Sequence, residues 1–164
     1  MKAIYAGSFD PITEGHWDII ERARLRVDEL TIVVATNPTK NYMFSIDERI
    51  ELIMDGIPSN WKNVDVISGG NSLTVQIAQR IGARTLIRGL RPHGDFEAEY
   101  SLALVNKNLA PMVETMFLIA KPELIAVSSS VVKELARHRQ DIGQYVSPLV
   151  KAAIEKKLLT YDQE

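Results

Sequence analysis

Short apolar runs rich in β-branched residues alternate along this chain with longer segments of helical period, and this alternation restricts the fold more than any other feature. Strands separated by helices need right-handed crossover connections, which produce a parallel sheet with helices on both faces. The apolar runs predict strands at residues 3–6, 30–35, 64–67, 85–87 and 115–119. The segments of helical period predict helices at residues 16–27, 73–81, 95–109, 129–137 and 148–157, and from the capping box at 45–48 to Gly56.

The length of 164 residues fits one domain with a substantial core. We therefore predict an α/β fold: a single Rossmann-like domain, residues 1–164, with a five-stranded parallel sheet and helices on both faces. The polar tail from about residue 160 is expected to be frayed. The large apolar side chains of Trp17, Met43, Phe44 and Phe96 are expected in the core, and the alternative is that they form a wall of the substrate site.

Unusual polar residues follow four of the predicted strands, in the segments 7–16, 36–40, 88–91 and 121–130. Open parallel sheets bind ligands at the carboxyl ends of their strands. Because these segments all begin at such ends, we expect them to meet at one rim of the sheet and to form a binding site there.

The first of these segments has the sequence of a phosphate cradle. Gly7 lacks a Cβ, so the backbone can approach a ligand closely, and a helix beginning near Gly15 offers unpaired N–H groups and the positive end of its dipole. The dipole disfavours an imidazolium, so we expect His16 to be a neutral N–H donor to a phosphoryl oxygen, with a purely structural histidine as the alternative. Ser8 either holds a phosphate oxygen or caps the turn.

Basic residues follow two other predicted strands. Arg88 and Arg91 flank Gly89 at the end of a buried strand, where each guanidinium needs an anionic partner. Phosphate is the expected partner, and salt bridges to the acidic residues at 95, 97 and 99 are the alternative. Lys40 lies in a turn after the second strand, where it is either solvated or in contact with a ligand.

The serines 128, 129 and 130 precede a predicted helix. One serine is enough for an N-cap, so the additional hydroxyls and the free N–H groups predict a second anion site, suited to the β- and γ-phosphates of a nucleotide. His93 and His138 have no metal-ligand spacing with a carboxylate. We therefore predict no metal site built by the protein.

The composition excludes several classes of protein. A net charge of −2 and a pI near 6.0 give no broad basic field, so no nucleic-acid partner is expected. Cysteine is absent, which excludes disulfides, thiolate metal sites and cysteine nucleophiles. Residues 1–7 are too short an apolar stretch for a signal peptide, and no run approaches the roughly 20 residues of a membrane span. We expect a soluble, cytoplasmic protein with no membrane partner.

The chain resembles the bacterial phosphopantetheine adenylyltransferases, a branch of the nucleotidyltransferase superfamily. The resemblance covers nearly the whole length and rests on an ordered set of motifs: GSFDP at 7–11, TEGH at 13–16, Lys40, RGLR at 88–91, DFExE at 95–99 and SSS at 128–130. Departures from the family are mild. Ser8 stands where the family often has threonine, and residues 92–94 form a loop variant.

The resemblance implies transfer of AMP from ATP to 4′-phosphopantetheine, giving pyrophosphate and dephospho-coenzyme A in coenzyme A synthesis. It also implies Mg²⁺ accompanying ATP, a homohexamer, and dephospho-coenzyme A or coenzyme A as product or feedback ligand. The predicted catalytic donors are His16, Lys40 and Arg91. The residues implied for phosphopantetheine are Ser8, Lys40, Thr74 and Arg88. Those implied for ATP are Ser8, Phe9, His16, Gly89, Leu90, Arg91, Glu99, Leu124, Ile125, Ala126, Val127, Ser128, Ser129 and Ser130.

Two other interpretations stay open from the sequence. Another nucleotidyltransferase, such as one that makes a nicotinamide dinucleotide or a CDP-alcohol, would share the superfamily motif. A nucleotide-sensing module would keep the cradle without turnover, and its expected mark is the loss of His16 or Lys40. Both residues are present.

Overall fold

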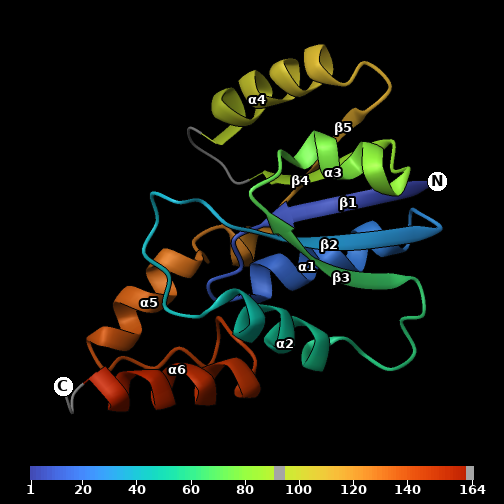
Figure 1. Cartoon of the computed structure of the whole chain (residues 1–164). Helices are drawn as coiled ribbons and strands as arrows, with labels where there is room; N and C mark the ends of the chain where they lie inside the picture. Colours follow the sequence, from blue (N-terminus) through green and yellow to red (C-terminus); the bar gives the residue numbers. More distant parts are fainter. Residues whose placement is uncertain (91–94, 162–164) are drawn as a thin grey trace.

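A five-stranded, all-parallel sheet in the order β3-β2-β1-β4-β5 forms the centre of the molecule (Figure 1). The structure is a computed structural model, and it describes residues 1–90 and 95–161. All five predicted strands are confirmed, and each predicted range lies inside the observed one. The strands are β1 (Lys2–Gly7), β2 (Glu29–Ala35), β3 (Val64–Gly70), β4 (Thr85–Leu90) and β5 (Glu114–Ile119).

Helices connect these strands at the predicted places, with small differences at their ends. They are α1 (Glu14–Arg24), α2 (Ile46–Gly56), α3 (Thr74–Ile81), α4 (Asp95–Leu109), α5 (Ser129–Arg137) and α6 (Pro148–Tyr161), with a 3₁₀ turn at Pro122–Leu124. Helix α1 begins two residues before the predicted start, because Thr13 is its N-cap. None of the helices in the described part of the chain is long and apolar enough to cross a membrane.

Local signals explain two of the helix ends. The capping box of α2 is confirmed: the Ser45 hydroxyl accepts the N–H of Glu48, and the Glu48 carboxylate accepts the N–H of Ser45. Gly82 ends α3 with a φ of 72°, a left-handed conformation that glycine adopts without strain. Helix α6 continues to Tyr161, so the first residues of the tail expected to be frayed are helical, and the last three lie outside the described residues.

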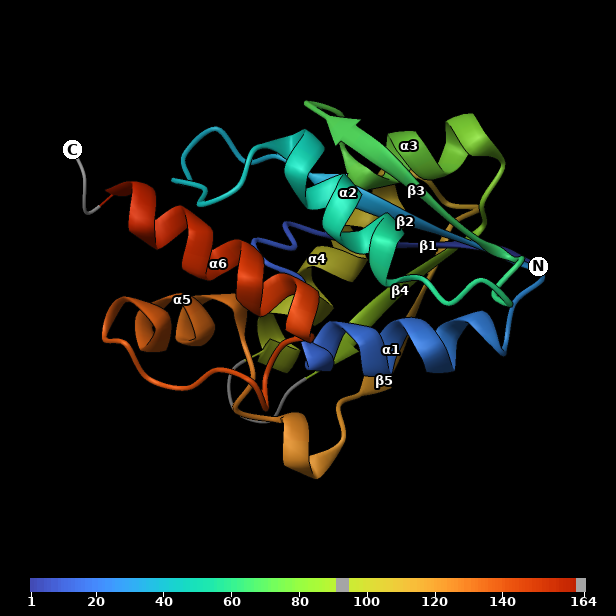
Figure 2. The same ribbon diagram turned by 90° about the horizontal axis from the view of Figure 1, so that it is seen from below.

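The helices cover both faces of the sheet, as predicted. Helices α1, α2, α5 and α6 lie on one face and α3 and α4 on the other (Figures 1 and 2). Successive residues of β1 point to opposite faces, so Ala3 and Tyr5 join one core and Ile4 and Ala6 join the other. The chain order reverses at β1, because β2 and β3 lie on one side of it and β4 and β5 on the other. Such a switch point is where open α/β sheets bind ligands.

The core prediction for the large apolar side chains holds for three of the four. Met43 and Phe44 are buried, and Trp17 packs against the same core. The prediction for Phe96 is wrong, since its side chain on α4 is 55% exposed. An apolar residue on a helix can face either the core or a partner molecule, and the sequence pattern does not distinguish the two.

Candidate active site

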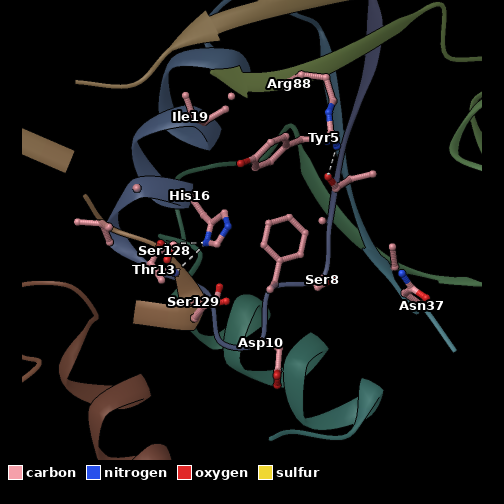
Figure 3. A pocket seen from close by; sticks show the side chains of 18 of the residues that line it. Tyr5, Ser8, Asp10, Thr13, His16, Ile19, Asn37, Arg88, Ser128 and Ser129 are labelled. Atoms are coloured by element: carbon pink, nitrogen blue, oxygen red, sulfur yellow. Dashed lines mark hydrogen bonds between the residues drawn. The ribbon is translucent and has the colours of Figure 1, made fainter. Parts of the chain in front are cut away.

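A cavity of about 810 Å³ opens at the carboxyl ends of β1, β2 and β4. Its walls come from all four polar segments that follow the predicted strands, so the expected convergence on one rim is confirmed for the described residues. Figure 3 shows side chains from β1, α1, α5 and β4 directed into this space.

Most of the predicted site residues line the cavity. They are Ser8, Phe9, His16, Lys40, Thr74, Arg88, Gly89, Glu99, Leu124, Val127, Ser128, Ser129 and Ser130. Leu90, Ile125 and Ala126 do not line it, although their neighbours Gly89, Leu124 and Val127 do. Arg91, predicted as a catalytic donor, lies outside the described residues, as does the loop variant at 92–94.

The cradle loop after β1 is folded over the ring of Phe9. A Cβ on Gly7 would lie 2.9 Å from this ring, so no larger residue fits there without a shift. Phe9 itself has a left-handed φ of 47°, which a bulky residue rarely adopts. Its ring is 1% exposed and packs edge-on against the rings of Tyr5 and His16, with centroid distances of 5.5 and 5.0 Å. The ring of Phe9 therefore forms the floor beside the imidazole.

The hydrogen bonds of His16 determine which ring nitrogen carries the proton. The N–H of Thr13 donates to Nδ1 of His16 at 3.0 Å, and the Thr13 hydroxyl lies 3.0 Å from the same nitrogen. A nitrogen that accepts an N–H bond carries no proton, so the ring is neutral and its proton is on Nε2. Figure 3 shows the ring extending from α1 toward β1. The geometry therefore agrees with the expected neutral donor.

Asp10 ties three parts of the cavity wall together. Its carboxylate is 2% exposed and accepts the N–H groups of Met43 and Phe44 at 2.9 to 3.1 Å. The Nζ atom of Lys133 on α5 donates to the same carboxylate at 2.7 Å. Lys133 lines the cavity, and sequence reasoning missed it, because a lysine in a helix has the pattern of an ordinary solvated residue.

Arg88 has a carboxylate partner in this structure. Nε of Arg88 donates to Glu99 Oε2 at 2.6 Å, Nη2 donates to Oε1, and Nη1 donates to the carbonyl of Ala6 at 3.0 Å. The salt bridge named above as the alternative to phosphate is thus present, because α4 places Glu99 beside the end of β4. Since Arg88 and Glu99 both line the cavity, the pair belongs to its wall.

The three serines differ in their roles. The Ser128 hydroxyl accepts the N–H of Val131 at 3.1 Å and is the N-cap of α5, as predicted for one serine. The Ser129 hydroxyl donates to the carbonyl of Pro11 at 2.8 Å, which ties α5 to the cradle loop. Ser130 is exposed at the cavity, and its hydroxyl makes no hydrogen bond within the described part of the chain.

The described wall of the cavity carries one more cation than carboxylate. The cations of the described lining residues are Lys40, Arg88 and Lys133, and the carboxylates are Asp10 and Glu99. Each carboxylate is paired with a cation. Residues 1–90 and 95–161 contain no group of three or more histidines, cysteines or carboxylates that could hold a metal ion.

Known proteins are similar in sequence to almost the whole of this chain. A family model described as cytidylyltransferase-like matches residues 4–135. A phosphopantetheine adenylyltransferase from Staphylococcus haemolyticus is 47% identical over 95% of this chain and 96% of the relative. One from Methylobacillus flagellatus is 44% identical over 96% of this chain and 98% of the relative. The chain belongs to the phosphopantetheine adenylyltransferase family. The resemblance inferred from the motifs is therefore confirmed, and the protein is a nucleotidyltransferase enzyme of coenzyme A synthesis.

Solved structures support the fold independently of these relatives. The nicotinic acid mononucleotide adenylyltransferase of Plasmodium falciparum, complexed with NaAD, superposes with a TM-score of 0.66 at 15% identity. The superposition covers 98% of this chain and 95% of that one. At so low an identity the likeness shows that the two proteins share the fold, and the phosphopantetheine adenylyltransferase assignment depends on the relatives above.

Proposed function

We propose that the chain performs its family's reaction, the transfer of AMP from ATP to 4′-phosphopantetheine, in the cavity of about 810 Å³. The observation that carries this proposal is the neutral imidazole of His16, whose Nδ1 accepts from Thr13 and whose proton is therefore on Nε2 at the cavity. A neutral N–H donor held rigidly at a helix start is suited to stabilise charge that develops on a phosphoryl oxygen.

The reaction needs no general base from the protein. The nucleophile is a phosphate oxygen of phosphopantetheine, whose second pKa is about 6, so it is already ionised near neutral pH. This oxygen forms a bond to the α-phosphorus of ATP while the bond from the α-phosphorus to the bridging oxygen breaks, and pyrophosphate leaves. The protein contributes positioning and charge stabilisation, for which His16, Lys40 and Arg91 are the proposed donors.

The two substrates are proposed to occupy different sides of the cavity. Phosphopantetheine contacts the side formed by the ends of β1, β2 and β4, through Ser8, Lys40, Thr74 and Arg88. ATP contacts the side between the starts of α1 and α5, through His16 and the segment 124–130. Because Arg88 is assigned to the acceptor and Glu99 to ATP, we propose that their ion pair lies between the two substrates.

Mg²⁺ is proposed to enter with ATP. The carboxylates of Asp10 and Glu99 each form an ion pair with a cation of the protein. They are therefore poor candidates for ligands of a metal ion bound by the protein itself. Mg²⁺ bound to the phosphates of ATP would neutralise part of their negative charge. The cations of the cavity wall then have to balance only the remaining negative charge of the phosphates.

We also propose that the protein is a homohexamer. Large apolar side chains are exposed on and beside α4, where no other described residue covers them, and one of them, Leu102, also lines the cavity. An exposed apolar patch of this kind marks an interface with another molecule. Its members are Phe96, Tyr100, Leu102, Leu104, Val105, Leu109, Met112 and Ile119. Sedimentation of the protein at micromolar concentration would measure the assembly, and a monomer would contradict this part of the proposal.

The remaining proposals concern location and ligands. The protein is assigned to the cytoplasm, and its partners are small molecules, with neither nucleic acid nor membrane among them. Dephospho-coenzyme A contains both the transferred AMP group and the phosphopantetheine acceptor, so the product is expected to compete with both substrates for the cavity. Coenzyme A is the corresponding candidate for a feedback ligand.

A panel of acceptors tests the proposed reaction. The purified protein is incubated with ATP or CTP and with phosphopantetheine, nicotinate mononucleotide or a phosphorylated alcohol, and pyrophosphate is measured. We expect pyrophosphate only with ATP and phosphopantetheine together. Release with another acceptor would indicate another nucleotidyltransferase. Binding of ATP without turnover for any acceptor would indicate a nucleotide-sensing module.

A further inference from the structure

The side chain of Arg49 on α2 is buried beneath the wall of the cavity, with only 2% of its surface exposed. Within the described part of the chain its guanidinium pairs with no carboxylate, and it bonds instead to backbone carbonyls. Nη1 donates to the carbonyls of Ser8 and Ala35 at 2.7 and 3.1 Å, and Nε donates to that of Ser45 at 3.3 Å. A buried charge is costly unless many hydrogen bonds compensate it, so these bonds hold their partners firmly.

These carbonyls belong to two different walls of the site. Ser8 is in the cradle loop after β1, and Ala35 is the last residue of β2, immediately before the turn that carries Lys40. Both carbonyls accept from the same nitrogen, Nη1, whose two N–H bonds are fixed in the plane of the guanidinium, so one side chain sets the distance between the two carbonyls. Arg49 therefore joins the loops after β1 and β2 from below.

A continuous series of contacts leads from Arg49 to Lys40. The guanidinium carbon lies 4.1 Å from the centre of the Tyr42 ring, which stacks on it. The Tyr42 hydroxyl accepts the N–H of Asn37 at 2.6 Å, and the N–H of Lys40 donates to the carbonyl of Asn37 at 3.0 Å. The turn at 37–40 is exposed and belongs to no helix or strand. Its position is thus set by Tyr42 and, through Tyr42, by Arg49.

We propose that Arg49 is a positioning residue for the acceptor phosphate, which fixes the Lys40 turn relative to Ser8. The inference rests on the proposed function, in which Ser8 and Lys40 both contact phosphopantetheine. Arg49 itself lies outside the lining of the cavity, so its effect on the substrate passes through the two loops. A misplacement of about 1 Å in such a group can cost up to roughly 100-fold in rate.

A double-mutant cycle between Arg49 and Lys40 tests this inference. The variants Arg49→Lys, Lys40→Ala and the double variant are compared for the KM of phosphopantetheine, for kcat and for ATP affinity by calorimetry. Lysine keeps the buried charge but loses the planar guanidinium, which fixes both N–H bonds of Nη1 and stacks on Tyr42. We expect Arg49→Lys to raise the KM for phosphopantetheine on the order of 10-fold, with ATP affinity nearly unchanged. The double variant is expected to be no worse than Lys40→Ala, because the two residues act through one contact.

Arg24 supplies the matched control. It is half-buried on α1, and its guanidinium stacks on Trp61 at 4.2 Å, outside the lining of the cavity. Arg24→Lys therefore removes a stacked guanidinium without touching the site, and we expect no change in either KM.

Tyr42→Phe is a second probe that keeps the ring over Arg49 and removes the hydroxyl that accepts from Asn37. We expect it to raise the KM for phosphopantetheine as well, even if Arg49→Lys does not fold.

The outcomes separate the inference from the function on which it rests. Lys40→Ala could raise the KM while the double variant shows the product of the two single effects. The two residues would then act independently, which overturns the inference but leaves the proposed function intact. If Lys40→Ala leaves the KM unchanged, the proposed acceptor contact fails and the inference fails with it. An unchanged KM in both Arg49→Lys and Tyr42→Phe also overturns the inference.

Discussion

Lys133 on α5 holds the buried carboxylate of Asp10 in the cradle loop, with its Nζ atom 2.7 Å from Oδ2. The same carboxylate accepts the N–H groups of Met43 and Phe44 from the loop before α2. One side chain thus links three segments that are distant in the sequence. Because its oxygens are engaged in this way, we propose that Asp10 has a structural role in the cradle and does not act as a base.

We therefore expect Asp10→Asn to keep the pH profile of the parent. In both proteins kcat/KM for phosphopantetheine should rise through the substrate's own ionisation near pH 6, with a normal or reduced amplitude in the variant. The lost ion pair should lower the free energy of unfolding by about 1–3 kcal/mol. Asp141→Asn is the control, because Asp141 pairs with Lys151 at the same distance of 2.7 Å on the surface. Abolished turnover in Asp10→Asn, with folding and both affinities intact, would require a protein base in the mechanism.

Arg88→Ala is expected to raise the KM for phosphopantetheine and to affect binding of ATP alone much less. The bidentate pair with Glu99 is the geometry in which a guanidinium binds an oxyanion, so a phosphate has to share or displace that partner. Arg88→Lys lacks the fork and should not rescue the affinity. Calorimetry with each substrate alone measures the two affinities. An equal loss for both substrates would contradict the proposed division of the cavity.

The link between α2 and α6 should make stability depend on pH. A hydrogen bond from Lys157, with smaller contributions from Ser45, holds the pKa of Glu48 below its usual value of 4.5. A carboxyl with a lowered folded pKa contributes stability above pH 4.5, and this contribution is lost as the pH falls through the folded pKa. Because the side chain is 38% exposed, the contribution should not exceed about 1 kcal/mol.

Glu48→Gln isolates this contribution, since glutamine can still accept from Ser45 in the capping box. Urea unfolding between pH 3 and pH 7 would measure it. We expect the parent to be more stable than the variant at pH 7 and the difference to fade below pH 4.5. A difference that stays constant over the whole range would show that the ion pair is not its source.

Features encoded by neighbouring residues could be predicted from the sequence. The bounds of α4 and α5 coincide with the predicted ranges, because apolar period and capping residues are local signals. The convergence of the site also followed from strand position alone. Pairings between distant residues could not be predicted in this way. Asp10 and Lys133 are 123 positions apart, and the sequence alone is equally consistent with two solvated side chains.

Two further features were ambiguous for chemical reasons. A guanidinium donates to a phosphate or to a carboxylate equally well, so the sequence could not decide between a ligand and Glu99 as the partner of Arg88. Arg49 lies in a helix of mixed apolar and charged residues, where an arginine usually reaches solvent. Its burial depends on the carbonyls of Ser8 and Ala35, which no local pattern reveals.

The rate of His16→Ala tests most directly whether this cavity is the site of adenylyl transfer. A donor aimed at charge that develops in the transition state should affect kcat far more than ATP binding, and its loss typically costs on the order of 10²–10³ in rate. His138→Ala is the control, since that side chain is 72% exposed and its Nε2 atom lies 3.2 Å from Glu134 Oε1, outside the lining of the cavity. We predict that His16→Ala loses turnover by this factor with ATP affinity nearly unchanged. Turnover equal to that of the parent and of His138→Ala would contradict the account.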